Sequence, residues 1–181
     1  MAISFEALAS LPTAGPLHEN FSSSRCGMHS EGFVVRFHSD ITGTWVGNFQ
    51  RGPSGISDVR LHPNGTHVIV VAGGDGYVID VETKRALSTF GGVISHILPI
   101  PGTSDLIFAE EVWLERFGVN GTVWQSERIS WDGFRAVKIE AGWVSGEAYT
   151  PLGDRWTRFS VRLSNGSVEG GSCNESELHR R

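Results

Sequence analysis

Residues 57–92 read SDVRLHPNGTHVIVVAGGDGYVIDVETKRALSTFGG, and our prediction of the fold begins from this segment. It holds four short strand-forming segments with a turn signal at each joint. Pro63-Asn64-Gly65 suits a tight hairpin, because proline fixes φ and the next two residues accept positive φ. Val68 to Ala72 is a continuous apolar run bounded by glycines, which predicts an interior strand buried on both faces. The stretch therefore predicts one complete antiparallel four-stranded sheet.

Side chains alternate in the flanking segments of this stretch. Val59 and Leu61 alternate with polar residues before the hairpin, and Tyr77 and Ile79 share one face of the third segment. The fourth segment, Ala86 to Phe90, contains Ser88 and Thr89 and is more polar than the second and third segments. We therefore expect it to form the outer edge of the sheet.

The order of turns and strands in this stretch matches a known repeat. A strand leads into the Pro63-Asn64-Gly65 turn, a buried strand and an Asp-Gly pair follow, and the next strand ends in Ile79-Asp80-Val81 before Thr83-Lys84 and a last strand. This order resembles one blade of a WD-repeat-like β-propeller, although Ile79-Asp80 replaces the usual Trp-Asp and the Gly-His pair that opens the typical blade is missing. The resemblance covers about one blade, and it implies a propeller architecture with a binding or scaffolding role.

Further sets of short strands precede and follow the central stretch. We expect strands over 33–37, 44–49, 94–100, 106–109, 113–117, 123–128, 134–139, 143–149 and 156–163, with a last short strand after Asn165-Gly166. The Asn-Gly pairs at 120 and 165 occupy equivalent joints, and their separation of 45 residues is close to the propeller blade period of about 40 to 50 residues. The first set has only two strands, so the first sheet is incomplete unless the N-terminal arm or the C-terminus supplies the rest.

These patterns predict an all-β fold of consecutive four-stranded antiparallel sheets, propeller-like with about four blades, which is near the lower limit for a closed ring. The alternative is a β-sandwich, or an open propeller fragment completed by dimerisation. The expected domains are an N-terminal arm over 1–31 with a possible short helix from Ser4 to Leu11, a single propeller-like all-β domain over 32–172, and a charged C-terminal tail over 173–181.

Composition narrows the possible partners. The chain has 181 residues, 23 glycines and a net charge of −5. Phosphate binding relies on Lys/Arg patches, so we expect no nucleic-acid partner. The N-terminus lacks a charged start and a long apolar run, and no basic helical segment is present, so we expect no signal peptide, no membrane contact and a cytoplasmic location. Cys26 and Cys173 either form one bridge between the two ends of the chain or remain free thiols.

The sequence contains no motif for catalysis, a cofactor or a metal. Gly74-Asp75-Gly76 lacks the third glycine of a dinucleotide-binding loop and leads into a strand, where that loop needs a helix. There is no Gly-x-Ser-x-Gly elbow, and the seven histidines lack ligand spacing. A carboxylate-based hydrolase would require Glu127, Asp132 and Glu147 to converge, which places it last among the functions that we consider.

Two clusters of aromatic and polar residues are candidate surface sites. The first comprises Trp45, Asn48, Gln50 and Arg51, and the second comprises Trp124, Gln125, Glu127, Arg128, Trp131 and Asp132. Large aromatic rings beside amide or guanidinium groups are typical of protein-binding hot spots. Alternatively, Asn48, Gln50 and Gln125 only provide hydrogen bonds to the backbone of edge strands.

Tryptophan is the residue type whose high number is most informative in this composition. The chain has six of them: Trp45, Trp113, Trp124, Trp131, Trp143 and Trp156. An indole ring either packs between sheets or stacks on a sugar, and a small all-β domain gains much of its core from such rings. The leading hypothesis is a non-enzymatic protein-binding or adaptor module, and a homodimer is also possible. The alternative is a carbohydrate- or small-ligand-binding module that uses exposed tryptophans.

Overall fold

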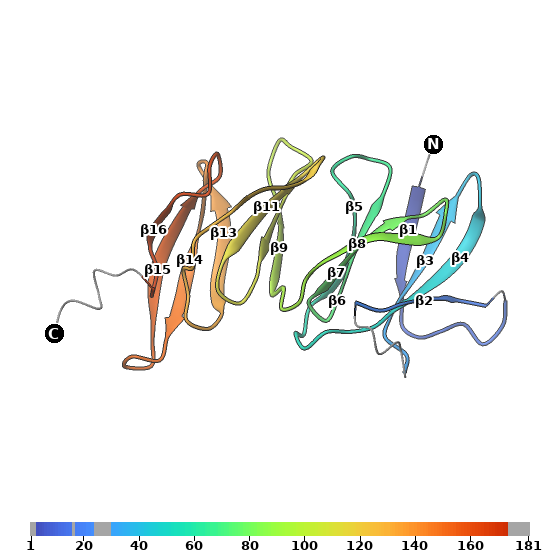
Figure 1. Ribbon diagram of the computed structural model, residues 1–181, viewed down its shortest axis with the longest axis horizontal. Helices are drawn as coiled ribbons and strands as arrows, with labels where there is room; N and C mark the ends of the chain where they lie inside the picture. The colour runs from blue at the N-terminus through green and yellow to red at the C-terminus, as the bar shows by residue number, and fades with distance from the viewer. Residues whose placement is uncertain (1–2, 16, 24–29, 174–181) are drawn as a thin grey trace. The chain divides into compact units, whose positions relative to one another are not determined.

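The computed structural model describes residues 3–15, 17–23 and 30–173, and within these ranges it contains strands and no helix. In this described part of the chain, sixteen β-strands form four consecutive four-stranded sheets, which are mostly antiparallel (Figure 1). The predicted all-β fold of consecutive sheets is confirmed, and each sheet has the strand number of a propeller blade. The chain divides into two compact units, Met1–Ile94 and Ser95–Arg181, with two sheets each.

Sheet 1 draws two of its strands from the N-terminal arm. Its order is β1 (Ile3–Leu8), β3 (Phe33–Ser39), β4 (Gly43–Phe49) and β2 (Glu19–Phe21). β1 pairs antiparallel with β3, whereas β2 pairs in parallel with the end of β4. The arm therefore completes the sheet whose two central strands are the ones that the sequence predicts.

The prediction of a short helix from Ser4 to Leu11 is wrong, because Ile3–Leu8 form β1. β1 pairs with β3 along its whole length, with Phe5 opposite Phe37. Ile3 and Phe5, two residues apart as in a strand, pack against the core of unit 1. A helix of about eight residues is marginal in water, whereas pairing with β3 supplies backbone hydrogen bonds along the segment.

Sheet 2 is the sheet predicted from residues 57–92. Its strands run in chain order as β5 (Ser57–Leu61), β6 (Val68–Ala72), β7 (Asp75–Asp80) and β8 (Arg85–Gly91). Every residue of β6 is buried, so the predicted interior strand is confirmed. β8 is the outer edge and is mostly exposed, as its polar composition predicts.

The core of unit 1 is largely aromatic. Phe21 of β2 stacks on Phe49 with ring centroids 4.7 Å apart, and Trp45 stacks on Phe37 at 4.4 Å. Tyr77 of β7 meets the edge of Phe49 at 5.4 Å. The Tyr77–Phe49 pair joins sheet 2 to sheet 1, and ring pairs of this kind add about 0.5–1.5 kcal/mol beyond their buried area.

Unit 2 contains two antiparallel sheets whose strands follow chain order. Sheet 3 comprises β9 (His96–Pro99), β10 (Leu106–Ala109), β11 (Leu114–Gly118) and β12 (Gly121–Gln125), and sheet 4 comprises β13 (Phe134–Glu140), β14 (Trp143–Thr150), β15 (Arg155–Arg162) and β16 (Val168–Gly170). Asn120-Gly121 and Asn165-Gly166 lie at the turns from the third to the fourth strand of their sheets, as predicted, and Gly121 is the first residue of β12. The core between the sheets contains Ile107, Leu114, Val144 and Phe159.

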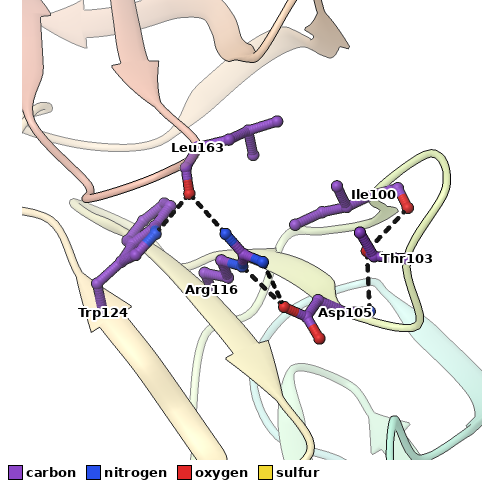
Figure 2. Close-up of polar contacts among 6 residues, drawn as sticks. All are labelled: Ile100, Thr103, Asp105, Arg116, Trp124 and Leu163. Atoms are coloured by element: carbon purple, nitrogen blue, oxygen red, sulfur yellow. Dashed lines mark hydrogen bonds and ion pairs between the residues drawn. The ribbon is translucent and has the colours of Figure 1, made fainter.

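Polar contacts link sheet 3 to the end of β15 (Figure 2). The Leu163 carbonyl accepts hydrogen bonds from Trp124 Nε1 at 2.8 Å and from Arg116 Nη1 at 2.9 Å. Asp105 pairs with the same guanidinium at 2.7 Å, and the Asp105 amide is held by the Thr103 hydroxyl at 3.2 Å. The two sheets of unit 2 are thus joined at their rim as well as through their core.

The predicted domain bounds stay predictions, and the division after Ile94 falls inside the single domain expected over 32–172. Cys173 forms no disulfide within the described residues, and Cys26 and residues 174–181 of the expected tail lie outside them. Within the part of the chain that the structure describes, no helix meets the length and hydropathy needed to span a membrane.

Candidate functional site

The first predicted cluster is mostly internal. Trp45 is 2% exposed, and its Nε1 donates to the Val81 carbonyl at 3.1 Å. Asn48 is also buried, and its side chain accepts from the Gly32 amide at 2.8 Å and donates to Asn20 at 3.0 Å. For Asn48 these hydrogen bonds favour the alternative interpretation, in which the side chain only provides hydrogen bonds to neighbouring parts of the chain. Both residues hold the arm and sheet 2 in place.

Gln50 and Arg51 are the accessible part of the first cluster. They line a small hollow of about 210 Å³ together with residues 30–32. The Arg51 guanidinium lies 5.7 Å from the centre of the Phe33 ring and donates to the Ser57 hydroxyl at 3.1 Å. This hollow is a minor candidate for contact with a partner.

The second predicted cluster spans the end of β12, which holds Trp124 and Gln125, and the connection between sheets 3 and 4, which holds Glu127, Arg128, Trp131 and Asp132. Trp131 is 39% exposed, and its Nε1 donates to the Ser172 carbonyl at 3.1 Å. Arg128 lies over the Trp131 ring at 5.1 Å and donates to the Ser130 carbonyl at 3.0 Å. Trp124 is half-buried and is bonded to Leu163 as described above. The exposed members of this cluster are Gln125, Glu127, Arg128, Trp131 and Asp132.

The carboxylates of the hydrolase hypothesis lie on different elements. Glu127 and Asp132 are exposed on the connection between sheets 3 and 4, whereas Glu147 lies on β14 and forms an ion pair with Arg135 at 2.6 Å. In residues 3–15, 17–23 and 30–173 there is no group of three or more His, Cys, Asp or Glu side chains placed to hold a metal ion.

A face that the sequence did not single out carries many aromatic and charged side chains. Alternate residues of β14 point away from the core of unit 2, and β15 places its own alternate residues directly opposite them. We call this surface the outer face of sheet 4. It comprises Arg135, Lys138, Glu140, Trp143, Ser145, Glu147, Tyr149, Trp156, Arg158, Ser160, Arg162 and Glu169.

Two arginines of the outer face of sheet 4 lie over tryptophan rings. The Arg162 guanidinium is 4.2 Å from the centre of the Trp143 ring, and the Arg135 guanidinium is 4.4 Å from that of Trp156. Tyr149 lies beside Trp156, with ring centroids 5.3 Å apart. A cation over an aromatic face gains about 0.5–1 kcal/mol at an exposed site. These side chains are therefore held in defined positions on an otherwise open surface.

A hollow of about 400 Å³ lies in the middle of this face. It is bordered by Lys138, Ser145, Glu147, Arg158 and Ser160. The pairing of β13 with β14 shifts between Arg135 and Lys138, where Ala136 has a φ of 52°. Such a bulge interrupts the ladder and bends the strand, and here it adjoins the hollow.

Part of this face could be predicted from the sequence. Arg158, Ser160 and Arg162 alternate with the apolar residues of β15, so one polar side of this strand could be predicted. The missing information was the register that sets Arg162 opposite Trp143 and Trp156 opposite Tyr149. Once that register is known, the outer face of sheet 4 becomes the main candidate site.

Comparison with known proteins adds little to this picture. No protein-family model matches the chain, and a search among curated proteins finds no match. A solved structure described as the crystal structure of the eukaryotic initiation factor is similar with a TM-score of 0.43 and 10% sequence identity, over 78% of this chain and 40% of that one. The chain thus spans less than half of that structure, and the likeness is too low to support a function.

Proposed function

We propose that this chain is a non-enzymatic protein-binding or adaptor module and that the outer face of sheet 4 is its main contact surface. The exposed residues of the two predicted clusters, together with the half-buried Gln50, are secondary contact candidates: Gln50, Arg51, Gln125, Glu127, Arg128, Trp131 and Asp132. The single observation that carries the proposal is the pair of tryptophans on this face, Trp143 and Trp156, each half-buried beneath an arginine.

The indole N–H groups distinguish these two tryptophans from three structural ones. Trp45, Trp124 and Trp131 each donate to a backbone carbonyl. Trp143 and Trp156 make no indole N–H hydrogen bond within the described residues. Tryptophan is enriched at interfaces because its ring supplies apolar area and its N–H can donate to a partner on burial. The two side chains can therefore give a partner both apolar contact area and a hydrogen bond.

The side chains on the outer face of sheet 4 are ordered before a partner binds, and this also favours binding. Tryptophan, tyrosine and arginine are the residues most enriched among binding hot spots, and this face has all three. Stacking restricts Arg135 and Arg162 before any partner arrives, so less side-chain entropy is lost on association. The surface is thus already arranged for contact.

The arginines weigh against the carbohydrate alternative. A sugar stacks on the open face of an aromatic ring, and the Trp143 and Trp156 rings already carry Arg162 and Arg135 on one face. A glycan would have to displace these guanidinium groups. Quenching of tryptophan fluorescence by a panel of soluble glycans tests this point, and a saturable change for one glycan would favour the carbohydrate function.

An affinity experiment with two matched variants tests the proposal. The full chain is immobilised as wild type, as the Arg158→Glu/Arg162→Glu double variant, and as Arg85→Glu on exposed β8 of unit 1. Proteins recovered from the source cell are quantified by mass spectrometry. We expect a partner that the wild type and the Arg85 variant retain and that the double variant loses about tenfold or more. Equal recovery by all three would exclude this face as the contact surface.

A further inference from the structure

The outer face of sheet 4 carries four cationic side chains, and two of its three carboxylates are already in ion pairs. Its carboxylates Glu147 and Glu140 already pair with Arg135 at 2.6 Å and Lys138 at 2.8 Å. Arg158 and Arg162 form no ion pair within the described residues. Glu169, at the edge strand β16, is the one carboxylate of this face that has no such pair. The free charge is therefore mainly positive on a chain whose net charge is −5.

The hollow concentrates these donors. Ser145 and Ser160 lie directly opposite each other on β14 and β15, and neither hydroxyl has a hydrogen-bond partner within the described residues. Lys138 and Arg158 border the same hollow. The Lys138–Glu140 pair is exposed on both sides, and such surface pairs are weak enough for a competing carboxylate to replace. Two hydroxyls between two cations form a surface that suits an oxyanion.

The spacing of donors along β15 matches an extended chain. Arg158, Ser160 and Arg162 point to the same face at every second residue, which is a repeat of about 6.6–6.8 Å. An extended peptide places its own alternate side chains at the same repeat. Acidic side chains at every second position would therefore meet Arg158, the hollow and Arg162 in turn.

We infer that the outer face of sheet 4 binds an extended acidic segment of the protein partner, with aspartate or glutamate at alternate positions and one carboxylate in the hollow between Lys138 and Arg158. Arg158 and Arg162 contact the flanking carboxylates, and the indole N–H groups of Trp143 and Trp156 donate to the segment at the ends of the contact. This inference rests on the proposed function and names the chemistry of its partner.

Fluorescence anisotropy of labelled peptides tests the inference with the full chain. The probe is a peptide of about ten residues, slightly longer than β15, in which Glu and Thr alternate. One comparison peptide replaces every Glu with Gln, and another has the same charge gathered in one block. We expect the alternating peptide to bind at least about tenfold more tightly than the Gln peptide, with affinity that falls steeply as salt rises.

Protein variants complete the test. Arg158→Gln is expected to weaken binding of the alternating peptide about tenfold, because a charge-assisted hydrogen bond is lost, and Arg85→Gln on β8 is expected to leave it unchanged. Equal binding of the Gln peptide, equal binding of the block peptide, or an unaffected Arg158→Gln variant would overturn the inference. If these peptides fail while the Arg158→Glu/Arg162→Glu chain still loses its protein partner, the contact surface stands and only the acidic chemistry is wrong.

Discussion

The indole N–H of Trp124 donates to the carbonyl of Leu163, the residue that directly follows β15, at 2.8 Å. Trp45 makes the corresponding 3.1 Å hydrogen bond to Val81, which directly follows β7. In both units a tryptophan of the first sheet thus holds the end of the third strand of the second sheet. Each carbonyl also has a second donor, Arg116 Nη1 at 2.9 Å for Leu163 and Thr42 Oγ1 at 3.4 Å for Val81.

Trp124→Phe should destabilise the chain by about 1–2 kcal/mol, because the variant keeps an aromatic ring and loses one hydrogen bond to a backbone carbonyl. Urea denaturation followed by circular dichroism measures the change. Trp143→Phe is the matched control, since its indole N–H has no partner within the described residues, and it should change stability by less than about 0.5 kcal/mol. Equal losses for the two variants would show that the bond to Leu163 contributes nothing.

Gly166→Ala should cost clearly more than Gly153→Ala. The two glycines have nearly equal φ values of 76° and 78°, so the conformational cost of about 1–2 kcal/mol is shared. A Cβ at Gly166 would lie 2.8 Å from the Trp124 ring, whereas one at Gly153 meets nothing within 4 Å. We expect a further loss of about 1–3 kcal/mol for Gly166→Ala from this clash. Comparing the thermal unfolding midpoints of the two variants measures this further loss. Identical midpoints would show that the clash with the Trp124 ring costs nothing.

Phe21→Ala should destabilise the chain by about 3–5 kcal/mol, although Phe21 belongs to a strand of only three residues. Its ring is 8% exposed and stacks on Phe49. Leu17→Ala lies in the same arm at a side chain that is 92% exposed, and it should stay within about 0.5 kcal/mol of wild type. Denaturant unfolding distinguishes the two, and a mild effect of Phe21→Ala would mean that the arm is dispensable for the fold.

Stability should decrease as the pH falls below about 6.5, the ordinary pKa of histidine. Burial lowers the pKa of His62, and the nearby His67 lowers it further, which outweighs the opposing hydrogen bond with Asn64. Burial also lowers the pKa of His96. Below pH 6.5 the unfolded chain therefore binds protons that the folded chain does not, and the loss continues until the lowered folded pKa is reached.

The variants His62→Asn and His62→Asn/His96→Asn test this pH dependence. The free energy of unfolding is measured at intervals from pH 7.5 down to about pH 5. The single variant should show a shallower decrease than wild type, and the double variant should be the shallowest of the three. An unchanged slope in the double variant would assign the acid sensitivity to other groups.

The sequence predicted the fold where local signals were strong. Val68 to Ala72 contains no polar residue, which clearly indicates an interior strand. The Asn-Gly pairs indicate two hairpin turns, because these residues tolerate positive φ. The arm was harder, because β1 pairs with residues about 30 positions away. Nothing local to residues 3–8 distinguishes a strand that depends on such a distant partner from a short helix.

The candidate site was predicted less well, and tryptophan shows why. Trp45 and Trp143 both lie in strands flanked by glycine, yet Trp45 packs on Phe37 in the core while Trp143 lies on the outer face beneath Arg162. The difference in burial between the two tryptophans depends on which face of each sheet is covered by a neighbouring sheet. That is a property of packing between sheets, which alternation within one strand does not reveal.

The parallel attachment of β2 to β4 would allow this chain to swap domains. β2 contributes a ladder of three residue pairs, the Phe21–Phe49 stack and the Asn48–Asn20 hydrogen bond to sheet 1, and an arm from a second copy could make the same contacts. Two chains that exchange β2 would form a dimer that has no new interface within the sheet. Oligomers of this chain would then increase with protein concentration and would disappear when the arm of each molecule is tethered to its own β4.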